Sequence, residues 1–252
     1  MNLLRFIKAD LYKLKHSPLI LLHVLAPFLA ATIFLAYYRV SGWSQVIKIS
    51  AYLEVIAVSL PLLIGLISSL AVSQELQAGG YRELLGVSKY RRTTILSKLV
   101  VLILLASISV LLAIMLFAFG MTYVLKASGP PISYYVAVSA KLIVSSVLIY
   151  LLSIFCSMQF GRGASISLGI FGSLIAALMI TGLGDKYWMY IPWGWGVRFC
   201  DITVLKWIKP DLYPLLKPQL ITCYTSLLVF NLIALVLTFY WFKKYEANKI
   251  ID

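Results

Sequence analysis

The sequence predicts an all-α integral membrane protein whose single domain, residues 1–252, crosses the bilayer with six helices. Hydrophobic residues make up 62% of the chain and charged residues only 12%, and the mean hydropathy is +0.94. Soluble domains are usually about 45–50% apolar, so this composition belongs to a membrane protein. The chain also contains six apolar runs, each long enough for the about 20 residues that a helix needs to cross the hydrocarbon core. Helices are expected because lipid offers the backbone no hydrogen-bond partners and the runs are too long for barrel strands.

The six predicted transmembrane helices follow the apolar runs, at residues 18–38, 51–73, 99–125, 135–159, 164–184 and 219–242. Their orientation follows from lysine and arginine, which are enriched in cytoplasmic loops. With a cytoplasmic N-terminus, thirteen of these residues lie in inner segments and eight in outer segments. We therefore expect both termini in the cytoplasm.

The segment before the first run, residues 1–17, has the pattern of an elbow helix in the membrane interface. Leu4, Ile7, Leu11 and Leu14 recur at helical spacing, whereas the basic residues fall mostly on other faces. The sixteen amphipathic residues before the apolar run are not expected to form a cleavable signal. The alternative is a basic tail without fixed structure that only sets the orientation.

The most polar stretch, residues 75–92, joins the second and third predicted helices on the cytoplasmic side. It contains the apolar pair Leu84 and Leu85, and Gly86 with Ser88 marks a break where one helix can end and the next begin. This pattern suits a small helix presented to a cytoplasmic partner. A solvated connection whose charge only sets the orientation explains the composition equally well.

The sequence lacks the motifs of several enzyme and binding classes. It has no G-x-x-x-x-G-K-[ST] phosphate loop, so the chain is not expected to hydrolyse nucleotide itself. It has no H-E-x-x-H motif, and its histidines and cysteines show no metal-ligand spacing, so neither a catalytic residue nor a metal is expected. The net charge of +13 is spread over short loops, which argues against nucleic acid as a partner.

The layout and the polar loop together resemble the permease subunits of ABC-2 type ABC transporters. The family pattern in this loop is a glutamate, a small-residue step, a Leu-Leu pair, a break, a basic pair and a lysine that opens the third helix. The matching residues are Glu75, Gly79 and Gly80, Leu84 and Leu85, Gly86 to Ser88, Arg91 and Arg92, and Lys98. Many members have proline at the break, where this chain has Val87. The chain length and the string YIPWGWGVRFCD are more narrowly similar to permeases of lantibiotic-immunity and bacitracin-type exporters.

This resemblance implies that residues 75–92 hold a coupling helix that docks on a separate cytoplasmic ATPase subunit. The implied docking face is Tyr81, Leu84 and Leu85, and the implied charged coupling residues are Glu75, Arg82, Glu83, Arg91 and Arg92. Rim charges of this kind orient docking more than they tighten it. The expected assembly is two ATPase copies, which hold ATP and Mg²⁺, and a second permease, identical or homologous, in a bacterial cytoplasmic membrane. No cofactor is expected on this chain.

The implied function is the ATP-driven export of amphipathic, lantibiotic-like antimicrobial peptides from the membrane, which gives immunity or resistance. An ABC-2 permease for another cargo, such as a drug, a lipid or a polysaccharide precursor, is an open alternative. A second alternative is a secondary transporter or assembly factor without an ATPase partner.

Two charged residues lie inside the predicted spans, Glu54 near the outer end of the second and Lys141 at similar depth in the fourth. Charges at such depth are costly and are usually paired or line a pathway. We therefore expect Glu54 and Lys141 to face one another or a shared polar cavity, as a structural ion pair or as substrate contacts.

The long outer segment, residues 185–218, contains four of the six tryptophans. Its candidate substrate contacts are Trp188, Trp193, Trp195 and Arg198. The simplest interpretation is an aromatic belt on interfacial or re-entrant helices that contacts lipid only, because Trp and Tyr are enriched at every membrane boundary. The alternative is a capture site for an amphipathic peptide, with aromatic faces against its apolar side.

Overall fold

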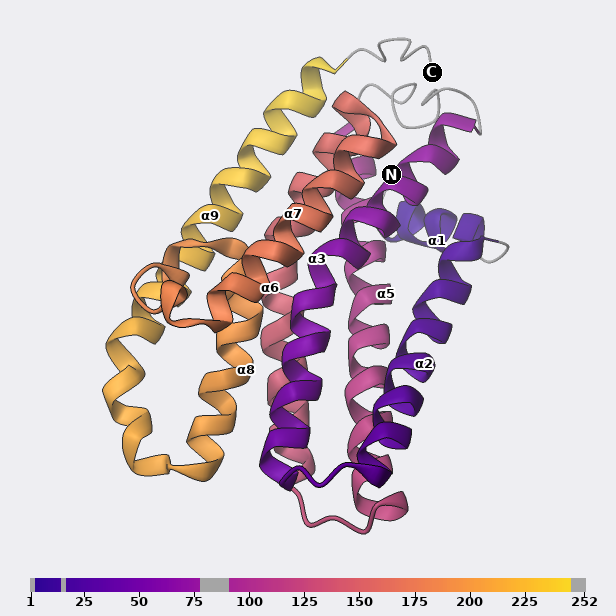
Figure 1. Cartoon of the computed structure of the whole chain (residues 1–252). Coiled ribbons are helices and arrows are strands. Elements are labelled where there is room, and N and C mark those ends of the chain that lie inside the picture. The colour runs from indigo at the N-terminus through magenta and orange to yellow at the C-terminus, as the bar shows by residue number, and fades with distance from the viewer. Residues whose placement is uncertain (1–2, 15–16, 78–90, 246–252) are drawn as a thin grey trace.

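The computed structural model describes residues 3–14, 17–77 and 91–245, and the described chain is almost entirely helical (Figure 1). Six of its helices are long and apolar enough to cross a membrane, which confirms the predicted fold class. The longer helices are α1 (Leu3–Leu14), α2 (Pro18–Val40), α3 (Gln45–Gln77), α5 (Arg91–Phe119), α6 (Ile132–Phe160), α7 (Arg162–Ile180), α8 (Pro192–Ile208) and α9 (Lys217–Lys244). The short helical turns are η2 (Gly120–Val124), η3 (Gly182–Gly184), η4 (Trp188–Tyr190) and η5 (Pro210–Leu216).

The boundaries of several helices differ from those of the apolar runs that predict them. α3 begins at Gln45 and α5 at Arg91, before the predicted starts at residues 51 and 99. Hydropathy marks the part of a helix that lies in lipid, whereas backbone hydrogen bonding continues into the polar interface. The fifth span is shorter than predicted and stops at Ile180, because Thr181 caps the turn η3 and accepts a hydrogen bond from the Leu183 amide at 3.4 Å.

The bundle has two ends, which we name by the elements found there. At the α1 end, α3 and α9 finish, α5 and α7 begin, and α1 lies across the direction of the other helices (Figure 1). Gly161 alone connects α6 to α7 at this end, with a φ of 88° in the left-handed region that favours glycine. At the η5 end, residues 41–44 and 125–131 join pairs of helices (Figure 1).

Among the described elements, the most extensive helix contact is between α3 and α7, where two glycines remove the side chains from the interface. A Cβ atom added at Gly65 would lie 2.5 Å from the Ser165 carbonyl oxygen, and one added at Gly169 would lie 2.7 Å from the Pro61 carbonyl oxygen. Ser165 also donates a hydrogen bond to the Gly65 carbonyl oxygen at 2.9 Å. Small residues allow such approaches in membranes, where dispersion contacts replace the hydrophobic effect as the force between helices.

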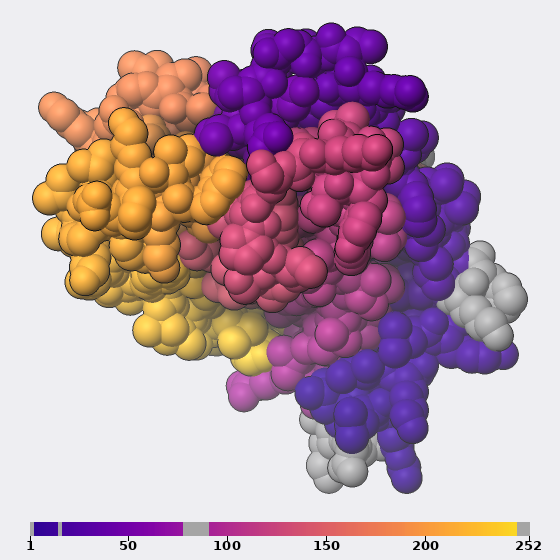
Figure 2. All heavy atoms as spheres, turned by 90° about the horizontal axis from the view of Figure 1, so that it is seen from below, coloured from indigo at the N-terminus to yellow at the C-terminus, as the bar shows by residue number. Residues whose placement is uncertain are grey.

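α8 lies lengthwise against α3. The Trp193 and Pro61 side chains both line the space beside Gly172, Gly196 lies near Ala57, and Cys200 lies near Leu53. Successive turns of α8 therefore follow α3 from its middle back toward the η5 end. Viewed from the η5 end, α8 and α9 lie on one side and α2 and α3 on the other, with the α5–α6 segment between them (Figure 2). The interfacial or re-entrant form expected for residues 185–218 stays a prediction.

The glycine contact gives a prediction about stability. Gly65→Val places a branched side chain against backbone atoms of α7, which cannot move aside, so we expect a loss of about 3 kcal/mol or more and little monodisperse protein. The measurement is the fraction of purified protein that stays monodisperse after heating in mild detergent. Gly163→Ala is the matched control, because no atom lies within 4 Å of the added Cβ and its melting curve should stay unchanged. Equal melting curves for Gly65→Val and wild type would contradict the close-contact interpretation.

Candidate functional site

The first polar cluster lies at the α1 end, on the two helices that flank residues 78–90. Lys98 Nζ on α5 donates to Glu75 Oε1 on α3 at 2.7 Å, and the two side chains are only 10% and 5% exposed. Separating the pair would leave a buried charge without a partner, which is costly. The ion pair therefore fixes the end of α3 relative to the start of α5.

The same cluster holds α1. Lys13 Nζ lies 3.4 Å from the second oxygen of Glu75, and Ser97 Oγ donates to Asp10 Oδ2 at 2.5 Å. Burial raises the pKa of the Asp10 carboxyl, although the hydrogen bond from Ser97 acts in the opposite direction. We call these five residues, Asp10, Lys13, Glu75, Ser97 and Lys98, the stem cluster.

A cavity of about 380 Å³ opens beside the stem cluster. Its lining mixes polar side chains, including Ser17 and Gln74, with apolar ones such as Leu14 and Val101. Gln74 Nε2 donates to the Ser17 hydroxyl, which also caps the first turn of α2. The start of α2 is thereby joined to the end of α3.

The predicted coupling residues fall into two groups. Glu75 is buried, and Arg91 Nη1 donates to the carbonyl oxygens of Lys243 and Tyr245 at 3.1 and 3.2 Å, whereas Arg92 is exposed. The structure thus places Arg91 at the end of α9 and Glu75 in the stem cluster. The remaining residues, Tyr81, Arg82, Glu83, Leu84 and Leu85, lie outside the described residues.

The second polar cluster lies toward the η5 end, where Glu54 and Lys141 both reach α8. The Glu54 carboxyl accepts a hydrogen bond from Ser50 at 2.5 Å and lies close enough to the Asp201 carboxyl to raise its pKa. Lys141 Nζ donates to the Thr203 hydroxyl at 2.7 Å. Among the described residues Glu54 and Lys141 form no ion pair with each other, because each finds its partner on α8. We call Glu54, Lys141, Asp201 and Thr203 the α8 cluster.

Asp201 is the residue of the α8 cluster whose protonation changes near neutral pH. Burial and the adjacent Glu54 carboxyl raise the pKa of Asp201 to about 7, against a smaller lowering effect of Arg198. A protonated Asp201 avoids two negative charges side by side.

The aromatic candidates in residues 185–218 mostly pack inside the protein. Trp188 and Trp195 are 2% and 0% exposed, and their ring nitrogens donate to Gln219 Oε1 and to the Met189 carbonyl oxygen. Trp193 packs on Phe171 of α7, edge to face. The exposed aromatic residues of the segment are instead Tyr187 and Tyr190, at 63% and 53%.

Arg198 holds the turn after α7 onto α8. Its Nη2 atom donates to the Thr181 carbonyl oxygen at 2.9 Å and to Asp185 Oδ1 at 2.7 Å. The Arg198 side chain is 15% exposed, whereas the Asp185 side chain is 65% exposed. An arginine so engaged has little freedom to contact a transported molecule directly.

Several residues of the two clusters were not found from the sequence. Asp10, Ser97, Asp201 and Thr203 lie far along the chain from their partners, and no motif links them. The signal for Asp201 was present but weak: a carboxylate on a helix of the outer segment, beside a predicted span that carries Glu54.

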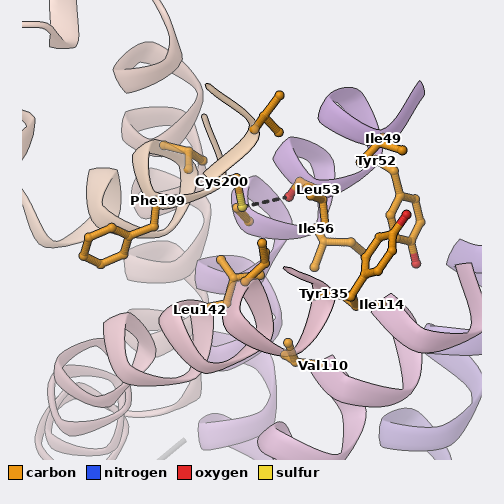
Figure 3. Close-up of a cluster of buried hydrophobic side chains, with 14 of the residues drawn as sticks. Ile49, Tyr52, Leu53, Ile56, Val110, Ile114, Tyr135, Leu142, Phe199 and Cys200 are labelled. Atoms are coloured by element: carbon orange, nitrogen blue, oxygen red, sulfur yellow. Dashed lines mark hydrogen bonds between the residues drawn. The ribbon is translucent and has the colours of Figure 1, made fainter. Parts of the chain in front are cut away.

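The cysteines of the described residues are free and form no metal site. No group of three or more His, Cys, Asp or Glu side chains suited to a metal occurs in the described ranges. Cys200 packs in the apolar core with its sulfur 3.7 Å from the Leu53 carbonyl oxygen, next to Leu142 and Phe199 (Figure 3). Its role is to seat α8 against α3.

The raised pKa of Asp201 predicts how stability depends on pH. The folded chain holds this proton more tightly than the unfolded chain, so the stabilisation is complete below about pH 4 and is lost as the pH rises to about 7. Asp201→Asn removes the charge, so near pH 8 we expect it to be more stable than wild type by about 1–3 kcal/mol.

Thermal unfolding in mild detergent across this pH range tests the prediction. The matched control Asp211→Asn changes an exposed carboxyl of η5 and should follow the wild-type pH profile. An Asp201→Asn variant with the same pH profile as wild type would refute the raised pKa of Asp201.

The sequence was compared with known protein families and with curated proteins. A family model described as "ABC-2 family transporter protein" matches residues 6–176, which is 171 of 252 residues and runs from α1 into α7. A search of curated proteins finds no match to the chain. The match includes the stem cluster, both helices that flank residues 78–90, and Glu54 and Lys141 of the α8 cluster. The chain therefore belongs to the ABC-2 family of transporter proteins, as a multi-pass membrane component with a role in transport that partners an ABC ATPase rather than being that ATPase.

Proposed function

We propose that this chain is the permease subunit of an ATP-driven exporter that removes amphipathic, lantibiotic-like antimicrobial peptides from the bacterial cytoplasmic membrane. The observation that carries the proposal is the α8 arrangement. α8 runs along α3 and brings Asp201 and Thr203 to Glu54 and Lys141, and the exposed Tyr187 and Tyr190 lie in the turns that precede α8, in a bundle of the ABC-2 family. Both termini then lie in the cytoplasm, so the α1 end faces the cytoplasm and the η5 end faces outward.

The energy source in this proposal is a pair of ATPase subunits that bind residues 75–92 and hold ATP and Mg²⁺. The stem cluster supports such coupling, since it links the helices on both sides of residues 78–90 by a buried ion pair. The permease works with a second permease, identical or homologous, so that a pathway can form between the two copies.

The cargo in this proposal contacts Tyr187, Tyr190 and the exposed Leu183 at the level of the outer headgroups. Tyrosine combines an apolar ring with a polar tip, which suits the apolar face of a peptide lying in that layer. Trp188 and Trp195 then act by shaping the segment from within, since they are buried.

An anionic lipid or polysaccharide precursor is the second candidate cargo, favoured by a specific feature. Lys141 lies close enough to Lys206 for mutual repulsion, and neither has a carboxylate within 4 Å among the described residues. Two such cations beside the Thr203 hydroxyl would suit a phosphate or pyrophosphate group.

Co-purification tests the ATPase partnership. The tagged chain, expressed with its neighbouring genes, should bring down an ATPase subunit in mild detergent, and the double change Leu84→Asp and Leu85→Asp should remove it by charging the docking face. Intact-mass measurement identifies what co-purifies and whether a second permease is present. The control is Leu215→Asp, which makes the same change at an exposed position of η5. With this variant the ATPase subunit should still co-purify. A chain that purifies alone in every case would favour a protein that works without an ATPase.

Growth inhibition tests the cargo. In a sensitive bacterium that expresses the complete transporter, the inhibitory concentration of a lantibiotic should rise several-fold, and the double change Tyr187→Ala and Tyr190→Ala should reverse most of the rise. Tyr123→Ala is the matched control, because Tyr123 is 73% exposed and lies outside the segment. Protection against a small polar drug with none against the lantibiotic would overturn the peptide cargo.

A further inference from the structure

The two helices that flank residues 78–90 are tied to each other and to α1 through one carboxylate, that of Glu75. We propose that Glu75, Lys98 and Lys13 are positioning residues for energy coupling: they make the ends of α3, α5 and α1 move together when residues 78–90 are displaced. The inference rests on the proposed function, in which an ATPase displaces these residues. In this proposal, the buried side-chain network converts the displacement of residues 78–90 into movement of three helices.

The two oxygens of the Glu75 carboxylate contact two different lysines. Oε1 accepts from Lys98 of α5 at 2.7 Å, while Oε2 lies 3.4 Å from Lys13 of α1. The carboxylate itself belongs to α3, two residues before the helix ends at Gln77. One side chain thus joins three helices directly beside the segment that follows.

The ion pair between Glu75 and Lys98 is buried. Glu75 and Lys98 are 5% and 8% exposed, so neither can find water as a substitute when the other moves away. A buried ion pair adds little stability compared with an apolar pair of similar size, but breaking it is strongly unfavourable. The Glu75–Lys98 ion pair is therefore better suited to fixing the geometry of the helix ends than to stabilising the fold.

α1 packs on α5, whereas α3 and α5 make few direct backbone contacts with each other. Asp10 of α1 accepts a hydrogen bond from Ser97 of α5, and Lys13 of α1, whose side chain is 39% exposed, contacts Glu75 of α3. A cavity of about 380 Å³ lies beside these groups, so the Lys13 side chain has room to change position. α1 and α5 therefore form one packed unit, and the Glu75 carboxylate ties the end of α3 to that unit.

The network also extends to the last helix. Arg91, the first residue of α5, donates to the carbonyl oxygens of Lys243 and Tyr245 at the end of α9. A displacement that enters through the start of α5 therefore reaches α9 by hydrogen bonds and α3 by an ion pair.

The joint can be tested on the permease alone by distances between spin labels. The three native cysteines are replaced by alanine, and labels are placed at Lys8→Cys on α1, Leu76→Cys on α3 and Arg92→Cys on α5, all exposed positions. The α3–α5 distance should be narrowly distributed, broad in Glu75→Gln, and narrow again when Glu75→Lys is combined with Lys98→Glu. Lys13→Gln should broaden only the α1–α3 distance, because α1 stays packed on α5. Equal widths in Glu75→Gln and in the unchanged background would overturn the joint.

The consequence for coupling is tested in the complete transporter, as cargo moved per ATP hydrolysed. Glu75→Gln and Lys13→Gln should lower this ratio by about fivefold or more, while the ATPase still co-purifies and melting temperatures stay near wild type. A merely structural role would lower cargo movement and ATP hydrolysis together. Lys8→Gln on the exposed face of α1 and Asp211→Asn at the η5 end are matched controls that should keep the wild-type ratio.

The outcomes separate this inference from the proposed function. If no ATPase co-purifies with wild type, the proposed function fails, and the spin-label distances still decide whether the joint exists. If wild type moves cargo and the Lys13→Gln transporter moves the same amount per ATP, the proposed function stands and the coupling role is refuted. Because Lys13 is partly exposed, Lys13→Gln should fold even if the Glu75 variants do not.

Discussion

The contact between α3 and α7 is the constraint on which the arrangement of the helices depends. Gly65 and Gly169 bring the two backbones together, and any side chain at either position would meet carbonyl oxygens of the other helix. α8 then packs beside this pair, with Trp193 seated against Gly172 and Cys200 against Leu53 (Figure 3). The α8 cluster exists only because α8 is held there, since Asp201 and Thr203 reach Glu54 and Lys141 from this position.

α3 connects the two polar clusters of the molecule. Glu54 belongs to the α8 cluster and Glu75 to the stem cluster, and one continuous helix carries both. At 1.5 Å per residue they are about 32 Å apart along the axis, close to the thickness of a hydrocarbon core. Pro61 lies between the two residues and lacks the backbone N–H that a helix hydrogen bond needs, so α3 can bend between its two polar clusters. The chemistry at the two ends differs, since a buried ion pair lies at one and two neighbouring carboxyl groups lie at the other.

The sequence was sufficient for the six spans but not for the contacts between them. Apolar runs of about 20 residues have few structural alternatives, so α2, α3, α5, α6, α7 and α9 could be predicted. The start of α5 at Arg91 could not, because hydropathy reports lipid contact and Arg91 lies in the polar interface. The partners of Glu54 and Lys141 were missed for another reason: which face of a helix meets which neighbour is decided by packing, and Asp201 lies 147 positions from Glu54. Glu75 stood out in the loop pattern, but only the structure shows that its carboxylate is turned inward to Lys98.

The brevity of α7 has a consequence for its tilt in the bilayer. With 19 residues the helix is about 28 Å long, whereas α3 with 33 residues is about 50 Å long. A helix that only just matches the hydrocarbon thickness cannot tilt far without drawing its polar ends into lipid. α7 must therefore stay close to the bilayer normal, whereas α3 is long enough to tilt and still cross.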